Sequence, residues 1–157
     1  MTVMERKINA IARSLLANDT AGRNRALAEL CGLMVESAKE DRVKNIAEQI
    51  DLILLELGVP DHVLGFHYLQ VAIRAAVDNH AIVHEITKAL YPMVAETCGT
   101  TPGRVERAIR HAIERGWDRG DLDAKNKYFG NKVDPCKGKP TNSEFIARVA
   151  NIVRSQI

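Results

Sequence analysis

The chain has 157 residues, of which 46% are hydrophobic and 27% are charged, and its formal net charge is +2. This length and composition are typical of one compact globular domain, with room for a small appendage. No apolar run approaches the roughly 20 residues that a membrane-spanning helix requires, so a membrane protein is excluded.

Cysteine usage and the first residues indicate a cytoplasmic protein. Cys31, Cys98 and Cys136 are far apart and odd in number, and no CxxC pair suggests zinc or a redox dithiol. We expect all three to be reduced thiols. The opening stretch MTVMERKINAIARSLL mixes charges into its apolar pattern and has no small-residue cleavage site, so it does not read as a signal peptide.

Apolar residues recur at helical spacing almost throughout, and no β-rich run interrupts them, which predicts an all-α helical bundle. Residues 1–40 carry two such stripes and form a predicted N-terminal helical extension. Two helices of this size bury little by themselves. We therefore expect the extension either to promote self-association or to cap the core. Its stripes are Met4, Ile8, Ile11 and Leu15, then Leu27, Leu30, Met34 and Ala38.

Residues 41–157 form the second predicted domain. A helical stripe runs from Val43 to Leu57, and GVPDH at 58–62 then ends it, because a glycine followed by a proline terminates helices. A further helix is predicted from about Gly65 to Asp78. The next begins near Ala81, and Pro92 either kinks it or opens a new helix; we favour a new start or a sharp kink.

The segment from 92 to 117 has the layout of a helix-turn-helix, with a short helix, a glycine turn and a second helix over 102–117. Ala95 is small enough for a close helix crossing, Gly99 suits the positive φ of the turn, and Val105 can seat the second helix. Thr101 is the expected N-cap and Pro102 the first helical residue.

The 102–117 helix separates apolar from charged residues. Val105, Ala108, Ile109, Ala112 and Ile113 share one face, and the other is basic. One interpretation is a solvated amphipathic helix in which Glu106 and Arg110 form a weak pair. The turn before it favours insertion into a DNA major groove. The polar face carries Arg104, Arg107, Arg110, His111, Glu114 and Arg115, with Glu106 at its border.

The basic charge is concentrated toward the carboxy terminus. From Thr100 onward twelve lysines and arginines face seven acidic residues, net +5, whereas residues 1–99 are net −3. Such asymmetry suggests a face for an anionic partner. After a short helix predicted at 121–129, a loop and a last helix follow, and Thr141 and Glu144 have the spacing of a capping box.

Base edges and phosphates call for different side chains. We expect Arg107 and Glu106 to contact bases, since arginine donates to guanine and a carboxylate accepts from cytosine. Arg110 is expected to brace Glu106 or to meet a phosphate. The residues expected to hold phosphates or neighbouring bases are Arg104, Arg110 and His111 on the helix, and Lys137, Lys139, Thr141, Asn142 and Ser143 in the loop and cap.

Other chemistry has weaker support. His80 and His84 are four apart, which suits a metal pair, but no third ligand is convincingly placed, so we expect no metal and no cofactor. His62 and His67 are expected to be ordinary surface or partly buried residues. Neither a nucleophile motif nor a glycine-rich phosphate loop is present, so we do not expect an enzyme. Trp117 is expected to anchor the core.

The stretches HEITKALYP, TTPGRVERAIRHAIERGWDRG and GKPTNSEFIARVA closely resemble the carboxy-terminal effector domain of the stage-zero sporulation protein A family, the sporulation response regulators. The resemblance extends from about Val43, through ELGVPDHVLGFHYLQVAI, to the end. It implies an all-helical domain that binds double-stranded DNA boxes of the TGTCGAA type, often as tandem copies, and contacts the RNA polymerase sigma factor.

One departure from that family bears on regulation. Its members carry an amino-terminal receiver domain with a phosphoacceptor aspartate, whereas only about forty residues precede the resemblance here, and their pattern is helical. No receiver domain is expected, and Asp51 lies inside a helical stripe. The chain is expected to be a sequence-specific transcription regulator. The alternative is an interaction protein that pairs with a full-length sporulation regulator and modulates it without binding DNA.

Overall fold

A computed structural model describes residues 2–16, 19–130 and 138–157, and every regular element in these ranges is helical. This confirms the all-α prediction. The elements are α1 (Val3–Leu16), α2 (Thr20–Glu56), α3 (Leu64–Asp78), the 3-10 turn η1 (His80–Glu85), the π-helical turn η2 (Ile86–Leu90), α4 (Tyr91–Cys98), α5 (Pro102–Arg119), α6 (Leu122–Tyr128) and α7 (Asn142–Gln156). None of the described helices is long and apolar enough to cross a membrane.

The chain divides into two compact units, Met1–Lys44 and Asn45–Ile157. The domain boundary expected after residue 40 stays a prediction. The first unit contains α1 and the beginning of α2, and only Ile11 and Ala26 among its described side chains are buried. α2 is continuous through the two stripes that the sequence suggests, because neither glycine nor proline lies between Leu33 and Leu57 to interrupt it.

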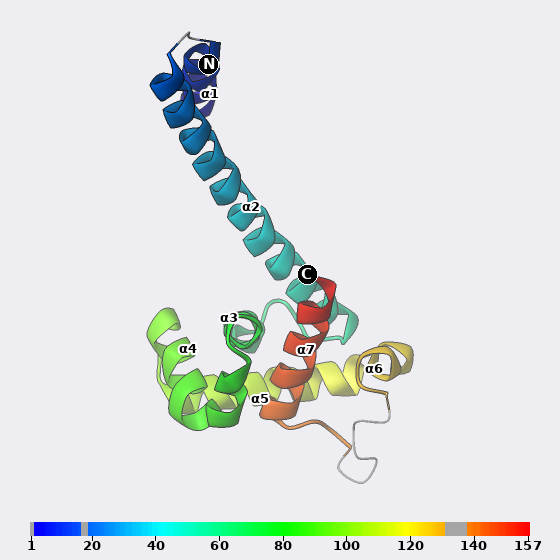
Figure 1. Ribbon diagram of the computed structural model, residues 1–157. Helices are drawn as coiled ribbons and strands as arrows, with labels where there is room; N and C mark the ends of the chain where they lie inside the picture. The colour runs from blue at the N-terminus through cyan, green and yellow to red at the C-terminus, as the bar shows by residue number, and fades with distance from the viewer. Residues whose placement is uncertain (1, 17–18, 131–137) are drawn as a thin grey trace. The chain divides into compact units, whose positions relative to one another are not determined.

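The second unit is built around α5. Figure 1 shows α5 running beneath α3 and α7, with α4 at one end and α6 at the other. Its contacts with all three of α3, α4 and α7 agree with that view. The predicted apolar stripe of α5 is buried at Val105, Ile109, Ala112 and Ile113. The amphipathic pattern of the sequence therefore sets which side of α5 faces the core.

α3 and α5 approach so closely that only glycine fits between them. A Cβ atom placed on Gly65 of α3 would lie 2.1 Å from the carbonyl oxygen of Ala108 and 2.6 Å from the Cβ of Ala112. These distances are far below van der Waals contact, so the backbone of α3 rests directly on α5. The close contact fixes the depth at which α5 sits in the core.

The helix-turn-helix predicted at 92–117 is confirmed. Gly99 ends α4 with φ +63°, in the left-handed region, and its amide donates to the carbonyl oxygens of Ala95 and Glu96. Ala95 and Val105 are both buried. Thr101 is the N-cap of α5 and Pro102 is its first residue, as the sequence predicts.

The segment between α3 and α4 differs from the single helix expected to begin near Ala81. It consists of η1 and η2, and Pro92 lies in the first turn of the new helix α4. The new start that the sequence favoured is therefore present. Because proline lacks an amide hydrogen and crowds the preceding turn, the chain before it adopts irregular helical turns.

An aromatic contact and a polar cluster lie at the α6 end of this unit. Trp117 packs against the core and meets the ring of Phe129 edge to face, with centroids 5.1 Å apart, in agreement with its expected anchoring role. Glu56 accepts hydrogen bonds from Lys127 at 2.8 Å and from the Tyr128 hydroxyl at 2.6 Å. These contacts hold α6 to the end of α2.

The close contact at Gly65 generates a stability prediction. Gly65→Ala forces a methyl group against the backbone of α5, so the free energy of unfolding should fall by about 1–3 kcal/mol, as for other overpacked cores. Gly103→Ala is the matched control, because a Cβ there meets nothing within 4 Å; it should be neutral or slightly stabilising. Urea unfolding followed by circular dichroism measures both, and equal stability of the two variants would contradict the prediction.

Candidate nucleic-acid interface

The exposed side of α5 carries the basic residues that the sequence singles out. Arg104, Arg107, Arg110 and His111 are all exposed, while Val105 and Ile109 between them are buried in the core. The Nε of Arg107 donates to the carbonyl oxygen of Gly103 at 3.2 Å, which orients the start of its side chain along the helix. Thr101 is exposed at the N-cap of the same helix. These side chains form one basic surface.

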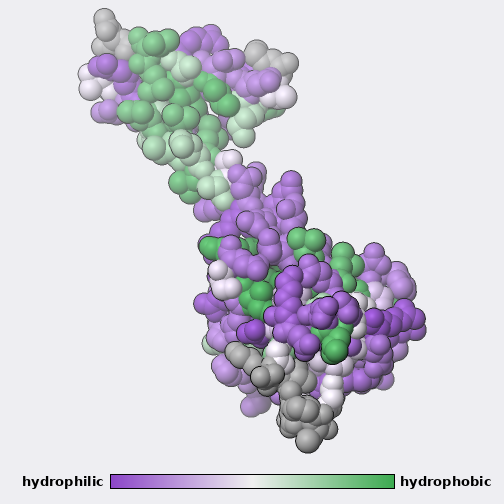
Figure 2. All heavy atoms as spheres, turned by 90° about the vertical axis from the view of Figure 1, so that its right-hand side faces the viewer, coloured by the Kyte–Doolittle hydropathy of each residue, from purple (hydrophilic) through white to green (hydrophobic). Residues whose placement is uncertain are grey.

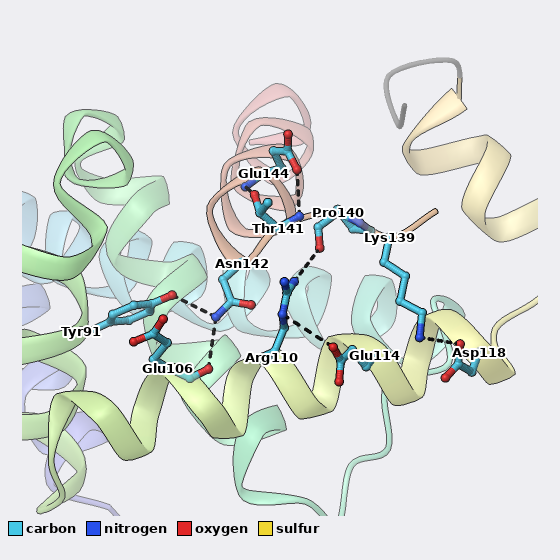
Figure 3. Close-up of polar contacts among 10 residues, drawn as sticks. All are labelled: Tyr91, Glu106, Arg110, Glu114, Asp118, Lys139, Pro140, Thr141, Asn142 and Glu144. Carbon is cyan, nitrogen blue, oxygen red and sulfur yellow. Dashed lines mark hydrogen bonds and ion pairs between the residues drawn. The ribbon is translucent and has the colours of Figure 1, made fainter. Parts of the chain in front are cut away.

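Arg110 has different partners from those expected. Its Nε lies 3.6 Å from Oε1 of Glu114, and its Nη1 donates to the carbonyl oxygen of Pro140 at 3.3 Å (Figure 3). The expectation that Arg110 braces Glu106 is wrong, because Glu114 and the loop before α7 occupy its guanidinium. Arg110 is still about half exposed, at 47%. It therefore joins α5 to the α7 side of the surface.

Asn142 also differs from its expected role. It is 8% exposed, and its Nδ2 donates to the Tyr91 hydroxyl at 2.9 Å and to the carbonyl oxygen of Glu106 at 3.1 Å. Figure 3 shows the amide between these two partners. We correct the expectation that it contacts a phosphate, because both amide hydrogens are used inside the fold. Asn142 instead connects α4, α5 and α7.

Burial raises the pKa of the Tyr91 hydroxyl, so this group stays neutral at physiological pH. The hydrogen bond from Asn142 acts in the opposite direction and lowers the pKa of Tyr91, but burial is the larger effect. The backbone carbonyl of Glu106 is engaged by Asn142, but its side chain is exposed on α5. Glu106 therefore combines a fixed backbone position with a carboxylate that faces outward.

The start of α7 contributes hydroxyl groups beside α5. Thr141 accepts a hydrogen bond from the amide of Glu144 and donates its own amide to the Glu144 carboxylate, which confirms the predicted capping box. Ser143 donates its hydroxyl to the carbonyl oxygen of Val83 at 3.2 Å. Thr141 is exposed, whereas Ser143 is half-buried. Thr141 is thus the more accessible of the two.

Lys139 forms an ion pair with Asp118, with Nζ 2.8 Å from Oδ1 (Figure 3). The pair is solvent-exposed, so it holds the lysine only weakly and leaves the ammonium near the α5 surface. Lys137, expected to hold a phosphate, lies outside the described residues. Of the loop lysines, Lys139 alone can therefore be placed beside α5.

A pocket of about 310 Å³ brings the two groups of expected residues together at the junction of α5, α7 and η2. The sequence did not single out Thr87, which lies on its rim in η2, because that segment was expected to be an ordinary helix. The spacing of residues from distant segments around one hollow depends on tertiary packing. Lining the pocket are Ile86, Thr87, Tyr91, Glu106, Arg107, Arg110, Thr141, Asn142 and Ser143.

His80 and His84, the histidine pair noted in the sequence, lie on η1. The rings of His80 and His84 meet edge to face with centroids 6.1 Å apart. Within the described ranges no group of three histidine, cysteine, aspartate or glutamate side chains is placed to hold a metal ion. The surface of α5 and the start of α7 carries arginines and hydroxyl groups together with the carboxylates of Glu106 and Glu114. Arginines and hydroxyl groups are typical phosphate contacts.

Comparison with known families gives a match to this same unit. Residues 50–153 match the family model described as sporulation initiation factor Spo0A C terminal. The match spans the end of α2, the helix-turn-helix and nearly all of α7, and it covers more than half of the 157 residues. The family is a helical, regulatory DNA-binding domain and not an enzymatic one. The chain therefore belongs to the family of the carboxy-terminal, DNA-binding domain of the sporulation initiation factor Spo0A.

Proposed function

We propose that this protein is a sequence-specific transcription regulator that acts in the cytoplasm and reads double-stranded DNA by docking α5 in the major groove. The observation that carries the proposal is the geometry of α5. One side is locked into the core through Val105 and Ile109, so the opposite side projects Arg104, Arg107 and His111 outward from a rigid helix. A rigid basic helix after a tight turn is the docking element of helix-turn-helix proteins.

The base contacts are assigned to the middle of that outward side. Arg107 projects opposite Val105 and Ile109 and offers a guanidinium to guanine O6 and N7. Glu106 offers a carboxylate to cytosine N4 from a backbone that Asn142 holds in place. A box of the TGTCGAA type, which the family resemblance implies, contains both bases. Because Arg107 and Glu106 are neighbours on one helix, their guanine and cytosine would lie in adjacent base pairs.

Phosphate contacts are assigned to the flanks. Arg110 is tethered to Glu114 and to the Pro140 carbonyl, so its guanidinium lies beside α7, where a DNA backbone would pass. Thr101, Arg104 and His111 lie along α5, and Lys139, Thr141 and Ser143 border its other side. Such contacts set the register on the duplex without reading sequence. Contact with the RNA polymerase sigma factor and binding to tandem boxes belong to the same proposal.

Mobility shift of labelled duplex by the purified full chain tests the proposed function. The chain should retard a TGTCGAA-containing duplex by itself and retard a scrambled duplex of equal length much less. The competing function, modulation of a full-length sporulation regulator without DNA binding, predicts no shift unless that partner is added. Selection of bound sequences from random duplexes would then define the box.

Arg107 and Arg110 have different surroundings, so their replacement should weaken DNA binding in different ways. Arg107→Ala should weaken binding to the matched box by about 1–3 kcal/mol and binding to scrambled duplex much less, because a base contact is lost. Arg110→Ala should weaken both duplexes by similar factors. Arg119→Ala, which removes the same charge from the last turn of α5, is the control and should have the smallest effect. Competition titrations measure all three, and equal losses on both duplexes for Arg107→Ala would remove it as the base reader.

Phosphate contacts also predict the salt dependence of binding. Each neutralised phosphate contributes about −0.9 to the slope of log K against log salt, so four to six contacts give a slope of roughly −4 to −5. Arg110→Ala should make this slope shallower by about one unit. Fluorescence anisotropy of a labelled duplex over a series of salt concentrations measures it, and a slope near zero would contradict groove docking through these cations.

A further inference from the structure

The N-terminal unit leaves most of its apolar surface uncovered. Of the thirteen large hydrophobic side chains that are exposed in the described residues, eight belong to residues 1–44, although this unit holds under a third of the chain. Figure 2 shows hydrophobic side chains gathered on the visible side of this unit. A soluble protein rarely leaves such a surface open. The eight are Val3, Met4, Ile8, Leu16, Leu27, Met34, Val35 and Val43.

The row that remains open on α2 has a regular spacing. Leu27, Met34 and Ala38 lie four or seven residues apart, as on one side of a helix that packs against another helix. Leu27 is 49% exposed and Met34 is 65% exposed. By contrast, Ala26 is buried, and Leu30 at the edge of the row and Leu33 beyond it are half-buried. One side of α2 is therefore more buried, and the row beside it is open.

Charges at the two ends of this row indicate what covers it. Arg23 lies four residues before Leu27, and Asp41 lies three residues after Ala38. The two are eighteen positions apart, five turns of an α-helix, so they continue the same row. A second α2 packed in the antiparallel sense places Arg23 of each copy beside Asp41 of the other. A parallel copy would place like charges together.

Other occupants fit less well. Among the described residues, the buried core cluster begins at Ile46. The five exposed large hydrophobic side chains described in the second unit are scattered over α2, α3, α6 and the end of α7. A polyanion would need a strongly basic face, but residues 1–44 hold eight lysines and arginines against six acidic residues. An apolar row with one opposite charge at each end is complementary to itself.

From this complementarity we infer that the protein forms a homodimer through an antiparallel pairing of the two α2 rows, centred on residue 32, the midpoint between Arg23 and Asp41. This selects self-association over capping of the core as the role of the extension. The arrangement is a two-fold, isologous interface. A dimer carries two α5 helices, so, if the proposed function holds, it binds a pair of boxes more tightly than a single box.

The mass of the full chain tests the inference. Sedimentation equilibrium should give twice the 17.4 kDa of one chain. Met34→Glu should raise the dimer dissociation constant at least about tenfold, because it buries a charge at the interface. Val35→Glu is the matched control: Val35 is similarly exposed, at 54%, but points about 100° away from the row. It should change the constant less than about twofold. A monomeric wild-type chain, or equal effects of the two variants, would overturn the inference.

Cysteine cross-linking tests whether the pairing is centred near residue 32. Cys31 is exposed and lies one residue from the centre, so the two copies of Cys31 face each other closely. A short bismaleimide should give a covalent dimer of the wild-type chain, and Cys31→Ser should abolish it. A chain with dimeric mass that yields no such product would overturn the pairing centred on residue 32.

Single-box DNA binding separates this inference from the proposed function. Met34→Glu should bind one box as tightly as the wild type, because α5 belongs to the other unit, and this result also shows that the variant is folded. Loss of tighter binding to paired boxes, with single-box affinity kept, supports the dimer. A monomeric wild-type chain that still binds its box overturns the dimer alone, whereas a dimer that binds no box overturns only the DNA-binding proposal.

Discussion

The close contact of α3 with α5 is the constraint on which the rest of the DNA-binding unit depends. Gly65 rests on the backbone at Ala108, so no side chain separates the two helices. Once α5 is held at this depth, its buried face cannot rotate without losing the burial of Val105, Ile109 and Ile113. The outward direction of the arginines is a consequence of this packing and needs no further restraint.

A small polar network then fixes α7 and α4 against α5. Asn142 spans the Tyr91 hydroxyl and the Glu106 carbonyl, and each of these partners lies on a different helix. Buried polar groups of this kind are costly unless they are hydrogen-bonded, so the network is specific to one arrangement of the three helices. Arg110 extends the same connection to Pro140 at the surface. The result is a packed platform that holds the basic side chains of α5 beside the start of α7.

The two units of the chain differ in how much apolar surface they bury. Asn45–Ile157 buries a continuous apolar core, so its fold does not depend on the exposed charged residues of α5. Among the described residues of Met1–Lys44 only two hydrophobic side chains are buried, so this unit buries little apolar surface within itself. In the two proposals made above, α5 contacts DNA and the α2 row pairs two copies, so the two roles belong to different units.

The sequence by itself determined the features that depend on neighbours within a few residues. The all-α class, the left-handed turn at Gly99, the start of α5 at Pro102 and the capping box of Thr141 and Glu144 were all predicted, because each rests on local backbone preferences or on spacing along one helix. The long quoted motifs were also enough to predict the family that the comparison then matched.

Tertiary structure decided the features whose partners lie far away in the chain. Asn142 reads as a surface cap residue, yet it turns inward because Tyr91, 51 positions earlier, supplies an acceptor beside it. Arg110 reaches the Pro140 carbonyl, 30 positions later, where helical spacing alone suggested Glu106. Periodicity reports which face of a helix is buried, but it carries no information on which distant group meets a given side chain. That choice is made only when the helices pack.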